Sequence, residues 1–328
     1  MLRHLLIGLA PLSLVAVGAF ASATPTSVER EIVRLSEASG GAVGVAAWRL
    51  DGKGPPILVH AGDRFPMAST FKIAVAGAVL ASVDEGRLKL DQMVTIESAD
   101  HVPSEVIADR FIHPGVSLSL HNLLELMLTQ SDNTATDVLM RVAGGSAAVT
   151  AWVRKQGVTE QRIDRDTAAL LRDFFGLPAG PLGEKYAEAL KQNSSIASKA
   201  AFPNPAFDDD ARDTSTPQAM AQLLTQIFNG KALSAASTQT LIEIMQHCRT
   251  GDARLRGRLP AGTVVANKTG TIGGSVNDVG VISLPDGAGK IVIAVFIKKS
   301  ALPFEQRERV IAEIARTVRD YYLLAEPR

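Results

Sequence analysis

The sequence predicts an α/β (α+β) fold: a five-stranded antiparallel sheet flanked by helices, with an all-helical lobe beside it. Strand-like apolar runs occur near both ends of the chain, two early and three late. The long stretch between them carries mostly helical patterns. One sheet assembled from both chain ends, with the helical stretch inserted into it, accommodates both observations. The five runs are 43–50, 57–60, 263–269, 276–284 and 290–297.

The first elements have clear start and stop signals. Thr26 and Glu29 fit a capping box for a helix over 26–39, which the pair Gly40-Gly41 ends. Asp51-Gly52 favours a tight turn between the first two strands.

Three stretches in the middle of the chain predict helices. Residues 71–83 are apolar nearly all round, which indicates a buried helix. A second helix carries an apolar stripe and ends near Thr129, and a third over 137–142 stops at Gly144-Gly145.

The C-terminal part begins with a helix between Pro217 and Gly230, since proline favours the first helical position and glycine the position past the end. Another helix is expected over 238–247, and a loop over 285–289 joins the last two strands. An amphipathic helix closes the chain. Its apolar face consists of Val310, Ile311, Ile314, Val318 and Tyr321.

Residues 1–23 predict a cleavable signal peptide. Arg3 and His4 precede an apolar run over 5–20, and Ala21-Ser22-Ala23 offers small residues for cleavage. The run is short for a membrane span, although an uncleaved anchor is the alternative. We therefore expect a periplasmic or secreted protein without a stable membrane span.

The 328-residue chain has a formal net charge of +0, which gives no reason to expect nucleic acid or an anionic membrane as a partner. Its length suits one large domain or two lobes. We expect a sheet lobe of residues 24–64 and 213–328 around a helical lobe of residues 65–212, in a monomeric protein.

Cys248 is the only cysteine, so no intrachain disulfide is possible, and we expect a buried structural thiol there. The six histidines lack the spacing of metal ligands, and no glycine-rich phosphate loop follows a strand. No metal and no cofactor is therefore expected.

The segment 69–72 carries the chemistry that the sequence signals most clearly. A serine hydroxyl needs a neighbouring base to act as a nucleophile, and positions three apart on a helix share a face. Lys72 can therefore serve Ser69, provided that burial or a second cation lowers the pKa of its amine. The alternative is that Ser69 caps the helix and Lys72 is a solvated charge.

Two further motifs make this interpretation specific. Ser131-Asp132-Asn133 follows the helix that ends near Thr129, and Lys268-Thr269-Gly270 lies at the end of a predicted strand. With S-x-x-K they form, in order, the triple of class A β-lactamases and penicillin-binding proteins, although Asp132 and Asn133 alone also suit a turn. The chain from about 28 to 322 resembles the class A β-lactamase family. Further similar segments are 130–135, 212–217, 250–251, 259–262, 277–280 and 284–287.

The resemblance implies a role for each matching position. Ser69 would be the acylated nucleophile and Lys72 its base, while Ser131 would protonate the departing lactam nitrogen and Lys268 would keep the local field positive. The other implied roles concern substrate binding. Asn133 would bind the substrate's side-chain amide, and the N–H groups of Ser69 and Thr271 would bind the oxyanion. The substrate carboxylate would be bound by the wall that consists of Thr269, Gly270, Thr271 and Arg254. For Arg254 an ordinary surface role is the alternative.

The chain departs from the family pattern in the loop that supports deacylation. The position of the family's glutamate falls on Thr167, and that of an asparagine that holds the hydrolytic water falls on Leu171. Neither side chain can do that work. Asp166, Glu160 or Lys72 itself are the possible substitutes.

Three functions remain open on this basis. The first is a serine β-lactamase that opens the β-lactam ring through an acyl-enzyme on Ser69. The second is a D-alanyl-D-alanine carboxypeptidase that acts on peptidoglycan stem peptides. The third is a slowly deacylating penicillin-binding or sensor protein.

Overall fold

The structure is a computed structural model that describes residues 26–104, 106–111, 113 and 115–324. The signal peptide expected at 1–23 lies outside the described residues. Within these ranges, no helix combines the length and the apolar character needed to span a bilayer.

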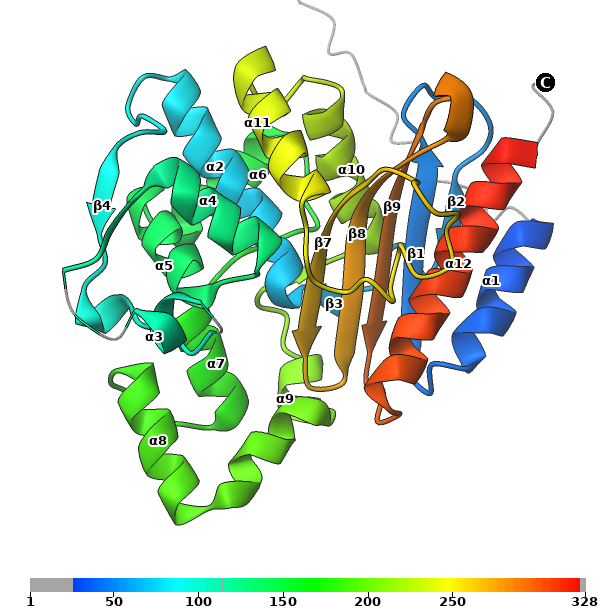
Figure 1. Cartoon of the computed structure of the whole chain (residues 1–328). Helices are drawn as coiled ribbons and strands as arrows, with labels where there is room; N and C mark the ends of the chain where they lie inside the picture. The colour runs from blue at the N-terminus through cyan, green and yellow to red at the C-terminus, as the bar shows by residue number, and fades with distance from the viewer. Residues whose placement is uncertain (1–25, 105, 112, 114, 325–328) are drawn as a thin grey trace, which may run out of the picture.

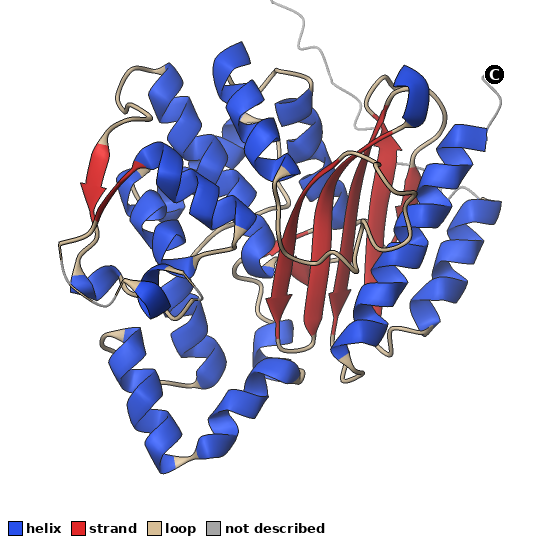
Figure 2. Cartoon of the chain, viewed as in Figure 1, coloured by secondary structure: helices blue, strands red, loops and turns tan. Residues whose placement is uncertain are grey.

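The central element is a five-stranded antiparallel sheet with strand order β2-β1-β9-β8-β7 (Figures 1 and 2). Two strands from the start of the chain thus join three from its end, as the sequence predicts. The expected sheet is confirmed, with one strand longer than foreseen, because β7 continues three residues beyond the predicted end at residue 269. The strands are β1 (Ala42–Arg49), β2 (Ile57–Val59), β7 (Val265–Ile272), β8 (Ser275–Ser283) and β9 (Lys290–Lys298).

Helices cover both faces of this sheet, because successive strand residues point to opposite sides. On β1, Val45 packs into the core under α1 and α12, while Ala46 packs into the larger core that includes α10. The predicted capping box of α1 is present, with Thr26 and Glu29 bonded reciprocally. The helices are α1 (Ser27–Glu37), α10 (Pro217–Phe228), α11 (Ala235–Gln246) and α12 (Phe304–Leu324).

Beside the sheet stands a mainly helical part, on the left of Figure 1. Its centre is α2, whose buried side chains lie all round, as predicted. At Gly77 of α2 a Cβ atom would lie 2.1 Å from the Trp152 ring, so glycine allows α2 and α6 to pack closely. The part also contains a two-stranded sheet that the sequence analysis did not predict. The elements are α2 (Lys72–Asp84), β4 (Met93–Thr95), α3 (Ile107–Arg110), β5 (Ser117–Ser119), α4 (Leu120–Thr129), α5 (Asn133–Val142) and α6 (Ser146–Lys155).

A helical excursion leads from this part back to the sheet and lies at the bottom of Figure 1. It lies within the stretch expected to be mostly helical, although its individual helices were not predicted. Leu182 is the only buried residue of α8, so this helix packs loosely. The elements of the excursion are α7 (Thr167–Phe175), α8 (Leu182–Gln192), the 3-10 segment η3 (Ser194–Ala201) and α9 (Pro205–Asp208).

The chain crosses between sheet and helical part at two places that lie side by side. The short strands β3 (Phe65–Pro66) and β6 (Thr214–Ser215) form an antiparallel pair. The expected lobe boundaries, at 64/65 and 212/213, fall beside this pair, although the division into lobes stays a prediction. The pair holds the segment that carries Ser69 close to the sheet.

Candidate active site

Ser69 lies in a single 3-10 turn, η1 (Ala68–Phe71), which leads directly into α2. Ala68 has a φ of +44°, a left-handed conformation that costs a non-glycine residue about 1–3 kcal/mol and is found mainly at functional sites. Phe71 occupies the cap position of α2 and makes no side-chain cap bond. The alternative that Ser69 caps the helix is therefore wrong.

Lys72 is fully buried at the start of α2, so the alternative of a solvated charge is also wrong. Its Nζ donates to the Ser131 carbonyl at 2.6 Å and to Asn133 Oδ1 at 2.8 Å. Burial, and next the Lys268 cation, lower the pKa of Lys72 well below its ordinary value, against the opposing effect of Asp132 and Asp137. Among the described contacts no hydrogen bond joins Lys72 to the Ser69 hydroxyl. The lowered pKa favours the neutral amine, which is the form that a base requires.

Ser131 brings the two lysines together. Its Oγ accepts a hydrogen bond from Lys268 Nζ at 2.9 Å and a longer one from Lys72 Nζ at 3.3 Å. Its backbone is left-handed, with φ of +60°. Burial is the main cause that lowers the pKa of Lys268 to about 8. A hydroxyl between two buried amines can pass a proton in either direction.

Asp132 holds this loop in place. Its Oδ1 caps α5 by accepting the Ala135 N–H at 2.8 Å. Its Oδ2 accepts from the Ile107 N–H and the Ser104 hydroxyl, both at 2.9 Å. Asp132 is therefore a turn residue, as its type suggests, and it also fixes Ser131 and Asn133 beside Lys72.

β7 passes directly in front of Ser69. Lys268, Thr269 and Gly270 lie in the middle of this strand rather than at its end, so that part of the prediction is wrong. At Gly270 a Cβ atom would lie 2.6 Å from the Met67 carbonyl oxygen and 3.1 Å from Ser69 N. Only glycine allows the strand and the turn η1 to approach this closely. The close approach brings the part of β7 that includes Thr271 near Ser69.

Two hydroxyls on the wall formed by β7 have defined partners. Thr269 Oγ1 lies 2.6 Å from Thr250 Oγ1, and Thr271 Oγ1 accepts from Arg254 Nη2 at 2.8 Å. Thr250 belongs to a segment that the sequence analysis singled out for its resemblance, without assigning it to the site.

Arg254 is only 3 % exposed, so the alternative of an ordinary surface residue is wrong. Its Nη1 donates to the carbonyls of Gly270 at 3.1 Å and Asn277 at 2.9 Å, and its Nε pairs with Glu308 at 3.0 Å. Arg254 therefore stands behind the β7 wall and orients the Thr271 hydroxyl from there.

The loop expected to support deacylation is anchored by a buried ion pair. Asp213 accepts the Arg165 Nε–H at 2.6 Å and the backbone N–H groups of Asp164 and Arg165 at 2.7 and 3.0 Å. Arg165 also pairs with Asp173 at 2.6 Å. These bonds fix the start of α7 against the rest of the site.

At the positions where the family pattern fails, the structure offers little of the expected chemistry. Asp166 is exposed, and its Oδ1 caps α7 by accepting the Ala169 N–H at 2.6 Å. Glu160 forms an exposed ion pair with Arg64 at 2.7 Å. Leu171 packs against an apolar cluster that includes Ala68. Thr167 is buried, and its hydroxyl lies beside the Asp137 carboxyl.

A different carboxylate, Asp137 of α5, contacts the first residues of α7, and it was not among the residues predicted for the site. Asp137 Oδ1 accepts the Thr167 N–H at 2.7 Å, and Oδ2 accepts the Ala168 N–H at 2.9 Å. Burial, and next the Asp166 charge, raise the pKa of Asp137 to about 7. The available signal was spacing, because Asp137 follows Asn133 by four residues on one helix and therefore shares its face.

The comparisons with known proteins agree with this geometry. Residues 27–322 match the model of the β-lactamase enzyme family. The extended-spectrum β-lactamase PER-1 of Pseudomonas aeruginosa is 31 % identical over 86 % of this chain and 82 % of its own. The carbapenem-hydrolyzing β-lactamase KPC of Klebsiella oxytoca is 31 % identical over 95 % of this chain and 94 % of its own.

Solved structures give the same result. A β-lactamase from Chitinophaga pinensis superposes with a TM-score of 0.73 at 31 % identity, over 90 % of this chain and 99 % of its own. An ancestral class A β-lactamase superposes with a TM-score of 0.74 at 35 % identity, over 89 % of this chain and 98 % of its own. The turn η1 with Ser69, the two lysines and β7 lie in one place, and the comparisons show the family: the chain belongs to the class A β-lactamase family.

Proposed function

We propose that this protein hydrolyses β-lactams through an acyl-enzyme on Ser69. The observation that carries the proposal is the Ser131 hydroxyl, which accepts hydrogen bonds from two buried amines, Lys268 and Lys72. A family of β-lactam hydrolases supports the general reaction. The arrangement of side chains around Ser131 supports the acyl-enzyme route.

In acylation, neutral Lys72 takes the proton of the Ser69 hydroxyl, whose oxygen attacks the lactam carbonyl carbon. The carbon–nitrogen bond breaks, and Ser131 gives its proton to the departing nitrogen. Lys268 then restores the proton of Ser131 along their 2.9 Å hydrogen bond. The developing oxyanion lies between the N–H groups of Ser69 and Thr271, where a single donor contributes about 3–4 kcal/mol in comparable sites. The packing of Gly270 against Ser69 supports that placement.

In deacylation, we assign the role of base to Asp137. Water attacks the ester carbonyl, and its proton passes to the Asp137 carboxylate. The ester bond to Ser69 Oγ then breaks as the Lys72 ammonium returns to that oxygen the proton it took in acylation. Asp137 lies one helical turn from Asn133, which bonds Lys72, and its charge acts on the Lys72 amine. A carboxyl with a pKa of about 7 is close to the optimum for a base at neutral pH. The Thr167 hydroxyl beside it supplies a further polar contact for the water.

A second candidate function is favoured by Thr167 and Leu171, which stand where the family carries glutamate and asparagine. If Asp137 does not act, the acyl-enzyme persists. The protein is then a D-alanyl-D-alanine carboxypeptidase, with the peptide as its true substrate, or a penicillin-binding sensor.

One experiment separates these functions. Purified protein is mixed with an excess of a chromogenic cephalosporin, and turnover is followed together with intact mass. We expect a burst followed by sustained turnover. A stoichiometric burst with a lasting adduct supports the sensor or the carboxypeptidase, and release of D-alanine from a stem-peptide mimic identifies the latter. A protein that forms no adduct, or that is labelled equally well after Ser69→Ala, contradicts the acyl-enzyme mechanism.

We further infer export and a monomeric state, both of which rest on the sequence. Intact-mass measurement of the protein from the extracytoplasmic fraction should give a chain that starts near Thr24. Light scattering should give the mass of one chain. An uncleaved N-terminus would favour the anchor instead.

A further inference from the structure

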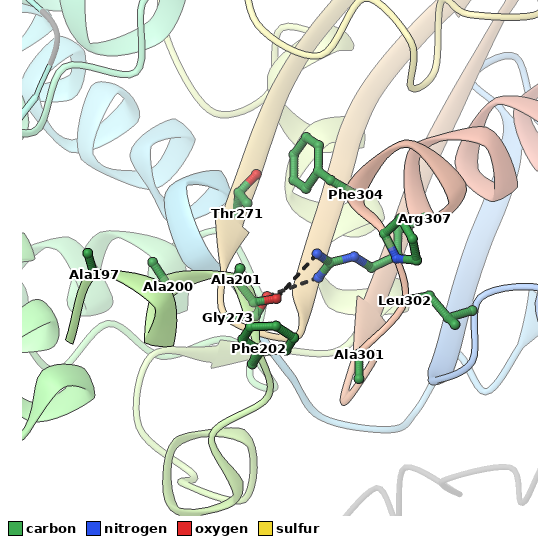
Figure 3. A pocket seen from close by; sticks show the side chains of 11 residues that line it. Ala197, Ala200, Ala201, Phe202, Thr271, Gly273, Ala301, Leu302, Phe304 and Arg307 are labelled. Carbon is green, nitrogen blue, oxygen red and sulfur yellow. Dashed lines mark hydrogen bonds between the residues drawn. The ribbon is translucent and has the colours of Figure 1, made fainter. Parts of the chain in front are cut away.

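A cavity of about 530 Å³ lies next to the site, between the end of β7, the segment η3 and the start of α12 (Figure 3). This volume is within the range of small-molecule pockets. Its wall is mainly apolar, with side chains such as Phe202, Leu302 and Phe304, and it contains one charged side chain, Arg307. The helical excursion supplies one side of the cavity.

The β7–β8 turn holds that side in place. Gly273 has a φ of +54°, and its N–H donates to the Ala200 carbonyl at 3.0 Å. A Cβ atom on Gly273 would lie 2.8 Å from the Phe202 carbonyl oxygen, so glycine is needed for this contact. Arg307 completes the junction, with Nη1 donating to Gly273 O at 2.9 Å and Nη2 directed at Ala201 O at 3.5 Å, as the dashed lines in Figure 3 mark.

Arg307 carries a positive charge without a direct ionic partner among the described residues, although Glu308 and Glu305 act on it from a greater distance. It is 3 % exposed, its Nε has no hydrogen-bond partner, and no carboxylate in the described part of the chain forms an ion pair with it. The neighbouring guanidinium of Arg254 has such a partner in Glu308. Both guanidinium groups lie over the Phe304 ring, at 5.2 and 5.5 Å from its centroid. Burial and the Arg254 charge lower the pKa of Arg307. A buried, unpaired cation is costly, and a bound anion offsets that cost.

The cavity adjoins the place where acylation is proposed. Gly270 packs against Ser69 N, and the next residue, Thr271, lines the cavity. In the proposed mechanism the Thr271 N–H holds the lactam carbonyl oxygen, and we place the ring carbon next to that carbonyl on the side of this wall. A substituent on that carbon stays on the enzyme after the ring opens, so the acyl side of the substrate is the part that can occupy the cavity.

We propose that the cavity binds the acyl-side substituent of the substrate, and that it selects an aromatic or apolar group bearing a carboxylate, which pairs with Arg307. The proposal rests on the proposed acylation of Ser69 and specifies which substrates are acylated fastest. The apolar wall takes the ring, and the free Nε–H of Arg307 donates to the carboxylate. Charge-assisted hydrogen bonds of this kind are among the stronger ones in proteins.

The test compares two penicillins that differ by one carboxylate, with phenylacetyl and phenylmalonyl side chains, by their second-order rates of Ser69 acylation. We expect the phenylmalonyl compound to be faster by about tenfold or more, in line with one charge-assisted hydrogen bond. Arg307→Gln should abolish this preference, so that the two penicillins acylate the variant at rates within about twofold of each other. The matched control is Arg309→Gln, on the same helix, whose side chain is 65 % exposed. It should preserve the preference.

A second variant tests the cavity without removing a charge. Ala200→Trp, at an exposed position on the cavity wall, should narrow the cavity and reduce the preference while Arg307 stays in place. Equal rates for the two penicillins in the unmodified protein, or an equal loss of both in Arg307→Gln, would overturn the proposal. Failure of both compounds to label Ser69 would instead contradict the proposed function, so the two failures are distinguishable.

Discussion

Lys268 donates a 2.9 Å hydrogen bond to the Ser131 hydroxyl and is itself fully buried. In the proposed mechanism, the Lys268 ammonium returns a proton to the Ser131 hydroxyl through this bond. Because burial lowers the pKa of Lys268 to about 8, this proton transfer is sensitive to moderately alkaline pH. The arrangement leads to the first prediction.

The rate of acylation should fall as the pH rises through about 8, because Lys268 then loses the proton that it supplies to Ser131. Lys268→Arg should move this fall in the acylation rate to higher pH, since arginine stays protonated throughout this range. Stopped-flow measurement of the cephalosporin burst from pH 6 to 10 checks it. Lys290→Arg, at an exposed position, is the control and should leave this fall unchanged. If the acylation rate of Lys268→Arg still falls near pH 8, the titration of another group causes the fall.

Asp137→Asn should slow deacylation by about 10²–10⁴-fold and leave acylation nearly unchanged, because the base for the attacking water is lost. In the unmodified protein the deacylation rate should rise with pH through about 7, as the Asp137 carboxyl ionises. Single-turnover decay of the acyl-enzyme, followed by mass spectrometry, measures both effects. Asp166→Asn, which keeps a good helix cap, should retain fast decay but shift its rise to lower pH, because the Asp166 charge helps to raise the pKa of Asp137.

The same carboxyl predicts how stability depends on pH. The pKa of Asp137 is about 7 in the folded protein and near 3.8 in the unfolded chain, so the folded state binds more protons between these values. This group therefore stabilises the fold fully at low pH, and its contribution is lost as the pH rises from about 4 to 7. Urea unfolding should show that Asp137→Asn removes this component. If Asp137 only anchors α7, the variant will lose stability while its deacylation rate and pH profile stay normal.

Thr167→Glu combined with Leu171→Asn should accelerate deacylation if that step limits turnover. The glutamate supplies a second base, and its position in the first turn of α7 suits a negative charge. We expect a gain of up to about 10²–10⁴-fold in the decay of the acyl-enzyme. The control, Thr167→Gln with Leu171→Asn, has a similar size without a titratable group. An equal gain in both double variants would mean that shape, not basicity, was limiting.

Gly270→Ala should impair acylation without unfolding the protein. The added Cβ would lie 2.6 Å from Met67 O and 3.1 Å from Ser69 N, so β7 must move away from the turn η1. A displacement of about 1 Å in a catalytic arrangement costs on the order of 100-fold in rate. Burst kinetics and a thermal melt measure the two effects. Gly62→Ala is the matched control, because an added Cβ there meets nothing within 4 Å.

Local patterns explain how much of the fold was predictable. The helix that Thr26 caps, the apolar stripe of α12 and the strands β1 and β9 each carry a signal within their own residues. Such patterns depend on short-range periodicity, which the sequence displays directly. The three motifs of the site were recognisable because each is contiguous in the chain. Their spatial meeting at Ser131 was implied by the family resemblance.

The rest depends on tertiary contacts, which leave no local pattern. Asp137 is important because α5 packs on the start of α7, and Arg254 is buried because Phe304 and Glu308 of α12 lie over it. Each looks like an ordinary charged residue when read alone. Within the excursion, α8 and η3 bury almost no side chain, so neither carries an apolar stripe from which its bounds could be predicted.

Cys248 has a practical consequence for experiments that follow ligand binding in solution. It is the only cysteine of the chain, it is buried, and its Sγ lies 3.4 Å from Thr250 Oγ1. A thiol in that setting is inert toward maleimides while the protein stays folded. A cysteine introduced at the exposed Ala200 would then be the single reactive handle, and a fluorophore attached there would report on occupancy of the neighbouring cavity without any background label.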